Sequence, residues 1–233
     1  MVPDKPLDLS KLSTKEFPLV DRLDRQQEDM VIKLYKKKRV IVDANAGSGK
    51  TTVATQAMKA LKDAGYIKQI YYVLFPVQER ALGYIPGGLA EKIKEYAIPF
   101  MDALVEAGEN PQRLVLEDMT NVLTMGDYKI VPHTFLRGRT LSDCGIIIDE
   151  IQNGTVSEIK KTLTRIADPC YVAMIGHTGQ VDIKNSGFAA MKHHFKQGIA
   201  SGEFQDVEFA ELTENYRGEF STFADKLGDY DYL

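Results

Sequence analysis

The stretch VIVDANAGSGKTTVA, residues 40–54, decides the fold. A short apolar run leads into a glycine-rich turn, which is followed by a lysine, two threonines and a helical pattern. This is the context of a phosphate-binding P-loop, in which backbone N–H groups and a helix N-terminus hold a phosphate. Ala44 stands where the usual pattern has its first glycine. We expect the change to matter little, because the amides that face the phosphate come mainly from later residues.

The side chains of this loop have expected roles. Lys50 is placed to reach the β- and γ-phosphates, and the Thr51 hydroxyl to ligate Mg²⁺. An ordinary glycine-rich turn between a strand and a helix is the alternative, but residue types and context both favour the P-loop. Further contacts with the nucleotide are expected from Asn45, Ala46, Gly47, Ser48, Gly49 and Thr52.

A second apolar run, residues 146–148, ends in the carboxylates Asp149 and Glu150. Asp149 can hold Mg²⁺ directly or through water, and Glu150 can polarise the attacking water as a general base. An aspartate alone would also suit a kinase or a switch, whereas the adjacent glutamate favours hydrolysis. Without the P-loop, a solvated acidic pair after a strand would explain the pattern equally well.

Two glutamines complete the expected nucleotide site. Gln180, in the sequence GHTGQ after another apolar run, is placed to orient water beside the γ-phosphate or to sense hydrolysis. Gln27 lies upstream of the P-loop, where an amide donor and acceptor can read the adenine edge. Gln26 is the neighbouring alternative to Gln27, and a solvent-facing glutamine is the alternative to both.

Arginine, histidine and cysteine residues are the remaining candidates for chemistry. The planar fork of arginine suits a phosphoryl transition state, although surface arginines are common. The histidines have no spacing that predicts a zinc site. Cys144 and Cys170 are far apart in the sequence and predict neither a metal-ligand pair nor a disulfide framework, which favours a reducing cytoplasm. The candidate arginines are Arg137, Arg139 and Arg217.

Size and composition limit the protein class. The chain has 233 residues, of which 44% are hydrophobic, enough for one substantial core. Its net charge of −4 excludes a chain-wide basic face but permits a local basic groove. The N-terminus is mixed in charge and unlike a signal peptide, and no apolar stretch is long enough to span a bilayer. We therefore expect a cytoplasmic protein without a membrane partner.

Apolar runs alternate with helical patterns along most of the chain, which predicts a parallel sheet covered on both faces. The runs lie at 40–42, 70–75, 145–148, 171–175 and 207–212. The helical patterns lie at 21–38, 51–64, 89–104, 155–166 and 187–199, and again from 219. Pro99 is expected to kink or restart its helix. The pattern also allows a strand at 128–135 and a short helix at 113–123.

The predicted fold is therefore an α/β, RecA-like P-loop NTPase fold. Its mostly parallel sheet has helices on both faces. Residues 1–19 are expected to form an irregular arm, and residues 20–233 a single P-loop ATPase domain. Ligands of such sheets bind at the carboxyl ends of the strands, where the polar motifs fall.

Three further segments resemble the PhoH-like family of P-loop ATPases. They are LGYIPGGLAEKIKEYAIPFMDAL (82–104), FLRGRTLSDCGIIIDEIQN (135–153) and GHTGQVDI (176–183). The chain is more distantly similar to the first motor domain of superfamily 1 helicases, in which LTENYRG (212–218) matches a motif whose arginine reaches the γ-phosphate. The resemblance runs in the same order from Gln27 to about Arg217.

This resemblance implies Mg²⁺-dependent ATP binding and hydrolysis, coupled to RNA or single-stranded nucleic-acid metabolism. It supports the roles given above to Gln27, Lys50, Thr51, Asp149, Glu150 and Gln180, and it favours Arg137 and Arg139 over ordinary surface arginines. The chain departs from the family pattern at Phe75, in the shorter stretch 76–82, and at His177, where the family usually has an aspartate.

A single motor domain leaves one side of the nucleotide site open. We expect a homo-oligomer, a head-to-tail ring such as a hexamer, in which Arg137, Arg139 or Arg217 acts in trans. Two other functions compete with the motor. The chain could be a nucleotide-gated assembly or regulatory subunit without a nucleic-acid substrate, or a small-molecule kinase, against which Glu150 argues.

Overall fold

The protein folds around one sheet of seven strands. The computed structural model describes residues 5–75, 89–110, 123–181 and 183–224. The strand order is β3-β4-β2-β5-β6-β1-β7, and every neighbouring pair is parallel except β3 with β4. This confirms the mostly parallel sheet. The bounds are β1 Arg39–Ala44, β2 Gln69–Leu74, β3 Leu123–Met125, β4 Tyr128–Pro132, β5 Cys144–Asp149, β6 Tyr171–Gly176 and β7 Glu208–Leu212.

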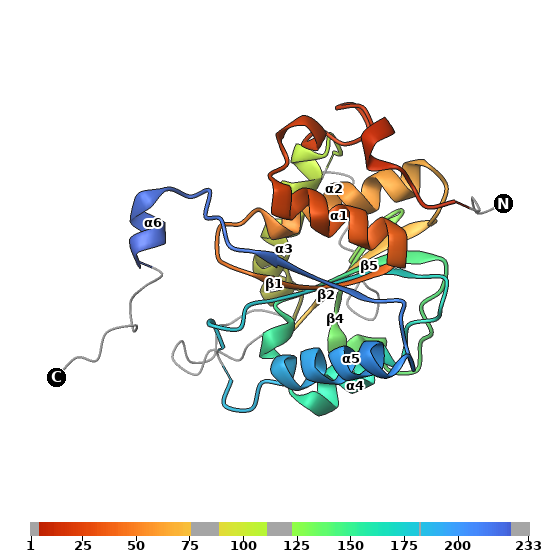
Figure 1. The fold of residues 1–233 in the computed structure, drawn as a ribbon, viewed down its shortest axis with the longest axis vertical. Helices are drawn as coiled ribbons and strands as arrows, with labels where there is room; N and C mark the ends of the chain where they lie inside the picture. The colour runs from red at the N-terminus through yellow and green to blue at the C-terminus, as the bar shows by residue number, and fades with distance from the viewer. Residues whose placement is uncertain (1–4, 76–88, 111–122, 182, 225–233) are drawn as a thin grey trace.

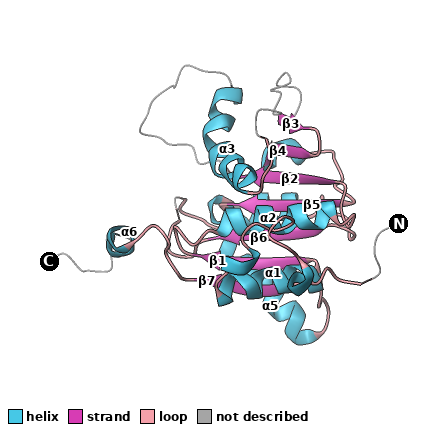
Figure 2. Ribbon diagram, turned by 90° about the horizontal axis from the view of Figure 1, so that it is seen from above, coloured by secondary structure: helices cyan, strands magenta, loops and turns pink. Residues whose placement is uncertain are grey.

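Helices cover both faces of this sheet, as predicted (Figures 1 and 2). On one face lie α1 (Arg25–Lys37), α2 (Lys50–Asp63) and α3 (Leu89–Glu106), whose apolar side chains share one buried cluster with the sheet. On the other face lie α4 (Val156–Leu163) and α5 (Phe188–Ser201), which pack on a second cluster. A short helix, α6 (Glu219–Ala224), stands away from this body in Figure 1.

The helix ends follow local sequence signals. Asp24 caps α1 and Thr155 caps α4, each in a capping box with the third helical residue. The helix restart considered at Pro99 is absent, because α3 runs through this residue as one helix. Phe100 and Leu104, which follow the proline, are fully buried, and this packing holds the last turns of α3 in place.

The described part of the N-terminal segment, residues 5–22, is packed against the body. It forms two 3-10 turns, Leu9–Lys11 and Val20–Arg22, and buries Phe17 completely. The backbone N–H of Leu19 also donates a hydrogen bond to Gln56 on α2. The stretch 76–82 and most of the predicted helix at 113–123 lie outside the described residues.

The two cysteines, which are far apart in the sequence, are neighbours in the fold. Cys144 begins β5 and Cys170 directly precedes β6, and these two strands pair in parallel. Both thiols are free and buried, with their sulfur atoms 3.5 Å apart. The sequence separation hid this contact because it depends on the order of the strands in the sheet.

Candidate nucleotide and catalytic site

The glycine-rich loop follows β1, and Ala44 is still part of that strand. Ala44 is buried and pairs with Leu212 of β7, so its extended backbone does not need a glycine. The left-handed backbone occurs later, at Gly47 and Gly49, both with φ of 73°. At Gly47 a Cβ atom would also lie 2.4 Å from the Asn215 side-chain oxygen, so both the turn and the close approach require glycine there.

The backbone of this loop is held from outside by two neighbouring segments. The Gln27 side chain of α1 donates to the Ser48 carbonyl at 2.9 Å. The Tyr216 N–H donates to the Gly47 carbonyl, also at 2.9 Å. Two carbonyl groups of the loop are thus bonded within the protein, and α2 begins at Lys50 with its N-terminus at the loop. The arrangement fits a phosphate, because N–H groups of the loop and helix remain to receive it.

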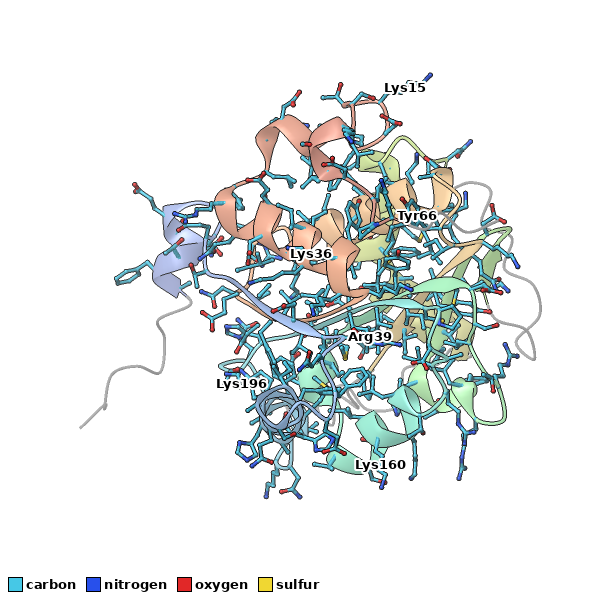
Figure 3. The ribbon with its side chains drawn as sticks, turned by 45° about the vertical axis from the view of Figure 1, so that its right-hand side comes forward. Lys15, Lys36, Arg39, Tyr66, Lys160 and Lys196 are labelled. Carbon is cyan, nitrogen blue, oxygen red and sulfur yellow. The ribbon has the colours of Figure 1, made fainter. Side chains whose placement is uncertain are left out.

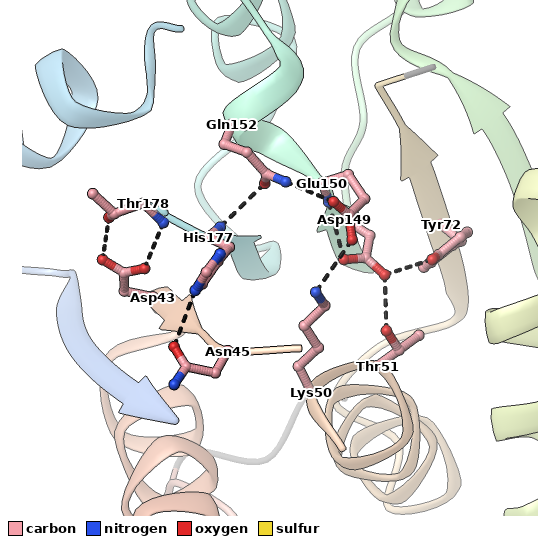
Figure 4. A network of polar contacts seen from close by, with 10 residues as sticks. All are labelled: Asp43, Asn45, Lys50, Thr51, Tyr72, Asp149, Glu150, Gln152, His177 and Thr178. Atoms are coloured by element: carbon pink, nitrogen blue, oxygen red, sulfur yellow. Dashed lines mark hydrogen bonds and ion pairs between the residues drawn. The ribbon is translucent and has the colours of Figure 1, made fainter. Parts of the chain in front are cut away.

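Asp149 lies at the end of β5 and is almost completely buried, with 3% of its surface exposed. One carboxylate oxygen accepts hydrogen bonds from the Thr51 hydroxyl at 2.8 Å and the Tyr72 hydroxyl at 2.6 Å (Figure 4). The other oxygen accepts the backbone N–H of Glu150 at 3.0 Å. Burial raises the pKa of the Asp149 carboxyl, and the positive charge of Lys50 opposes this rise.

The hydroxyl of Thr51 and the carboxylate of Asp149 form a hard-oxygen pair of the kind that Mg²⁺ prefers. Within the described ranges, no group of three or more His, Cys, Asp or Glu side chains could hold a metal ion. An Mg²⁺ ion here would therefore depend on this pair together with water and phosphate oxygens. The predicted metal residues are thus brought together, and Tyr72 is an unpredicted third member.

Glu150 follows directly and adopts a left-handed backbone with φ of 54°, which is rare for a residue with a side chain. One of its carboxylate oxygens pairs with the Lys50 ammonium at 3.2 Å. The other accepts a hydrogen bond of 2.6 Å from the Gln152 amide. The structure thus places the proposed base beside the P-loop lysine, and Gln152 is a second contact that the sequence analysis missed.

The two glutamines considered for adenine both have partners inside the protein. The Gln27 side chain is 6% exposed and bridges the Asp24 N–H and the Ser48 carbonyl. Gln26 exchanges hydrogen bonds with the backbone and hydroxyl of Thr213. Adenine reading by either one stays a prediction and would require it to exchange an internal bond.

The loop after β6 is fixed by two contacts with β1 and the start of the P-loop. The His177 ring contacts the Asn45 side-chain oxygen at 3.0 Å. The Thr178 backbone N–H donates to Asp43 at 3.0 Å, and Lys192 of α5 pairs with the same carboxylate. Gln180, the expected sensor, is exposed in the same loop. His177, a departure from the family pattern, is therefore a direct contact between this loop and the P-loop.

The three candidate arginines are all exposed, but they lie in different places. The Arg217 side chain lies over Gly47, since a Cβ atom there would be 3.0 Å from its Cγ. Arg137 and Arg139 follow the 3-10 turn after β4, and three strands separate β4 from β1. Of the three, Arg217 is therefore the one gathered at the P-loop of its own chain.

Tyr72 and Gln152 carried only weak signals in the sequence. Tyr72 lies within an apolar run, where an aromatic residue is expected to be core. Gln152 comes two residues after Glu150 and reads as a polar turn residue. Their contacts depend on the neighbouring positions of β2, β5 and β6, and strand order is not visible in one sequence.

Known structures of low sequence identity share this fold. The large terminase of a thermophilic bacteriophage, in complex with ADP, matches with a TM-score of 0.55 and 12% identity. The match covers 90% of this chain and 50% of the terminase. Another structure of the same terminase has a TM-score of 0.58. Within the described parts of the chain, no helix is long and apolar enough to cross a membrane.

Curated relatives match more closely in sequence. A PhoH-like protein of Bacillus subtilis is 34% identical over 191 residues, and one of Mycobacterium tuberculosis is 30% identical over 216 residues. These matches cover 78% and 86% of this chain but 57% and 58% of the relatives, so the chain spans little more than half their length. The family described as PhoH-like protein matches residues 20–216. The chain therefore belongs to the PhoH-like family.

Proposed function

We propose that this chain is a Mg²⁺-dependent ATPase whose hydrolysis is coupled to RNA or single-stranded nucleic acid. The observation that carries the ATPase is the meeting of Lys50, Thr51, Asp149 and Glu150 at the carboxyl ends of β1 and β5. One cation, one hydroxyl and two carboxylates are groups that P-loop NTPases use to bind phosphates and Mg²⁺ and to orient the attacking water.

Each group has one step in the proposed mechanism. Lys50 exchanges its ion pair with Glu150 for the β- and γ-phosphates. Thr51 and Asp149 would hold Mg²⁺, which when bound would neutralise charge on the phosphates. Glu150 then accepts a proton from the attacking water as the γ-phosphoryl group leaves ADP.

The arginine that completes this site is proposed to come from a neighbouring subunit. Arg137 and Arg139 are exposed and follow β4, and three intervening strands separate β4 from the P-loop strand β1, too far along the sheet edge for these arginines to act on their own site. A head-to-tail homo-oligomer would bring them to the next subunit's P-loop. Arg217 and Gln180 are proposed to contact the γ-phosphate in cis.

The nucleic-acid part of the proposal rests on the family resemblance. Figure 3 labels the basic residues Lys15, Lys36, Arg39, Lys160 and Lys196, which come from several elements of the fold. The second candidate is a nucleotide-gated assembly subunit.

Hydrolysis of ATP with Mg²⁺, measured with and without RNA or single-stranded DNA at several salt concentrations, tests the proposal. Stimulation that weakens with salt is expected, because phosphate contacts release counterions. Lys50→Ala should abolish nucleotide binding, whereas Lys62→Ala, on the same helix but paired with Asp127, should not. An ATP hydrolysis rate that nucleic acid leaves unchanged at every salt concentration would favour the assembly subunit. Turnover that survives Lys50→Ala would contradict the ATPase site.

A further inference from the structure

The contacts around Glu150 point to a residue with no role in the expected site. We propose that Gln152 is the positioning residue that keeps Glu150 aimed at the attacking water once Lys50 has moved to the phosphates. This inference rests on the proposed ATPase function and assigns a further residue to it. Three observations carry it: the two partners of Glu150, the fixed orientation of Gln152, and its link to the P-loop.

The two partners of Glu150 have different availability during turnover. Lys50 holds one carboxylate oxygen at 3.2 Å, and Gln152 holds the other at 2.6 Å. The P-loop lysine is required by the phosphates of a bound nucleotide, so its ion pair with Glu150 is exchanged on binding. Of these two partners, Gln152 is the one that remains. Because 45% of the Glu150 side chain is exposed, it would otherwise be free to change rotamer.

Gln152 is suited to this task because it cannot turn. Its side chain is 1% exposed, and its carbonyl oxygen accepts the backbone N–H of His177 at 3.2 Å. That bond determines which end of the amide is the acceptor, so the NH₂ end must face Glu150. A buried amide with both ends bonded has one stable orientation. Its hydrogen bond therefore also fixes the orientation of the Glu150 carboxylate.

The far end of Gln152 leads back to the P-loop. The Asn45 amide donates to the Thr213 carbonyl at 3.2 Å, which leaves its oxygen to accept from the His177 ring nitrogen Nε2 at 3.0 Å. A chain of contacts therefore begins and ends in the P-loop (Figure 4). It links Asn45, His177, Gln152, Glu150 and Lys50 in that order. When Lys50 binds the phosphates instead of Glu150, the contacts through Gln152 and His177 still hold the Glu150 carboxylate in position relative to the P-loop.

The test separates catalysis from binding. Gln152→Met keeps the length of the side chain and removes both hydrogen bonds. We expect kcat to fall roughly 10- to 100-fold, the range for a misaligned catalytic group, while the KM for ATP and the Kd for ADP stay within about twofold. Gln152→Glu retains the acceptor for the His177 N–H but sets two carboxylates against each other, and it should lower kcat at least as much. This second variant keeps the test valid if the methionine variant folds poorly.

Gln56→Met is the matched control. Gln56 is equally buried on α2, and its oxygen accepts the Leu19 N–H at 2.9 Å, a contact with the N-terminal segment rather than with the carboxylates. The same substitution there should lower the thermal midpoint and leave kcat unchanged. A fall in kcat equal to that of Gln152→Met would show that lost stability explains both, and would overturn the proposal.

Other outcomes separate this proposal from the ATPase itself. If the unaltered chain hydrolyses ATP and both Gln152 variants keep its kcat, Gln152 has no positioning role and the ATPase stands. If the variants lose ADP affinity in proportion to kcat, Gln152 supports the loop rather than the base, and the proposal also fails. His177→Ala should lower kcat, and should add little in the Gln152→Met background, because both act through one chain of contacts. If the unaltered chain shows no hydrolysis, the ATPase and the positioning role fall together.

Discussion

The charged groups proposed for catalysis fall into two sets that are held differently. The carboxylate side consists of Asp149 and Glu150, and the arginine side consists of the three candidate arginines. On the carboxylate side, Asp149 is buried and Glu150 is held at both oxygens by residues of the same chain. On the arginine side, Arg137, Arg139 and Arg217 are exposed. A charge that must act at one point in a transition state is effective only when it is held in place beforehand. The carboxylate side meets this condition within one chain, whereas Arg137 and Arg139 do not, and Arg217 lies over Gly47 but is exposed.

This difference suggests a division of labour. In the proposed mechanism, the chain supplies its own base and metal ligands, whereas Arg137 and Arg139 act from a neighbouring subunit. On this proposal, a subunit binds ATP without rapid turnover until its neighbour is in place. The predictions below test each half of this contrast.

The largest effect is expected on the arginine side. Arg137→Ala combined with Arg139→Ala should lower kcat by about 10³- to 10⁵-fold, the range for a lost arginine finger, with ATP binding kept. If these arginines act in trans, equimolar mixing with Lys50→Ala should restore about a quarter of the turnover, because each subunit supplies the part that the other lacks. Turnover of both mixed and separate samples is measured by phosphate release.

Arg217→Ala provides the internal control for that experiment. Its side chain lies over Gly47 of its own chain, so mixing with Lys50→Ala should restore nothing. The assignment of cis and trans arginines would be reversed if mixing with Lys50→Ala restored turnover to Arg217→Ala but not to the Arg137→Ala, Arg139→Ala double variant.

On the carboxylate side, Glu150→Gln should lower kcat by about 10²- to 10⁴-fold, the usual contribution of a general base. ADP binding should be retained or become tighter, because the variant frees Lys50 from its ion pair. Titration of a fluorescent ADP analogue measures this, with the exposed Glu211→Gln as control. Loss of binding in step with turnover would remove Glu150 from the role of base.

The sequence predicts the features that depend on local patterns, but not the contacts that depend on the order of the strands. The strands, helices and P-loop follow from local patterns, and the acidic pair follows from its place after an apolar run. Tyr72 and Gln152 do not, because their contacts join strands that are neighbours only in the folded sheet. Cys144 and Cys170 illustrate the same limit, since 3.5 Å separates sulfur atoms that lie 26 positions apart in the sequence. The arginines were visible as residue types, but their distances from the P-loop were not.

A third prediction concerns the buried carboxyl itself. Burial raises the pKa of Asp149, so its ionised form is disfavoured by folding. The associated stability is present at low pH and is lost as pH rises through the raised pKa. Asp149→Asn cannot ionise, so its thermal midpoint relative to the unaltered chain should rise as the pH increases from about 4 through the raised pKa of Asp149.

The measurement for Asp149→Asn is made without nucleotide or Mg²⁺. A change of a few degrees is expected, at roughly 2–4 °C per kcal/mol for a chain of this size. Asp168→Asn, on a side chain that is 98% exposed, controls for loss of a surface carboxylate. A midpoint difference that shrinks as pH rises would mean that Lys50, Thr51 and Tyr72 outweigh burial at this site.

The smallest effect is expected at Tyr72, whose hydroxyl donates a hydrogen bond to Asp149, the proposed metal ligand. Tyr72→Phe removes the 2.6 Å hydrogen bond to Asp149, and Tyr35→Phe removes a 3.0 Å bond from an equally buried ring to the Ala57 carbonyl. Both should lower the free energy of unfolding by about 1–2 kcal/mol. Only Tyr72→Phe should raise the Mg²⁺ concentration needed for half-maximal turnover. The rise should be a few-fold, below the roughly 10- to 100-fold typical of a lost metal-ligand partner, because Thr51 still bonds the same oxygen. An equal Mg²⁺ requirement in both variants would show that Asp149 is positioned by the P-loop alone. The contacts that hold the carboxylate side in place would then be those of Lys50, Thr51 and Gln152.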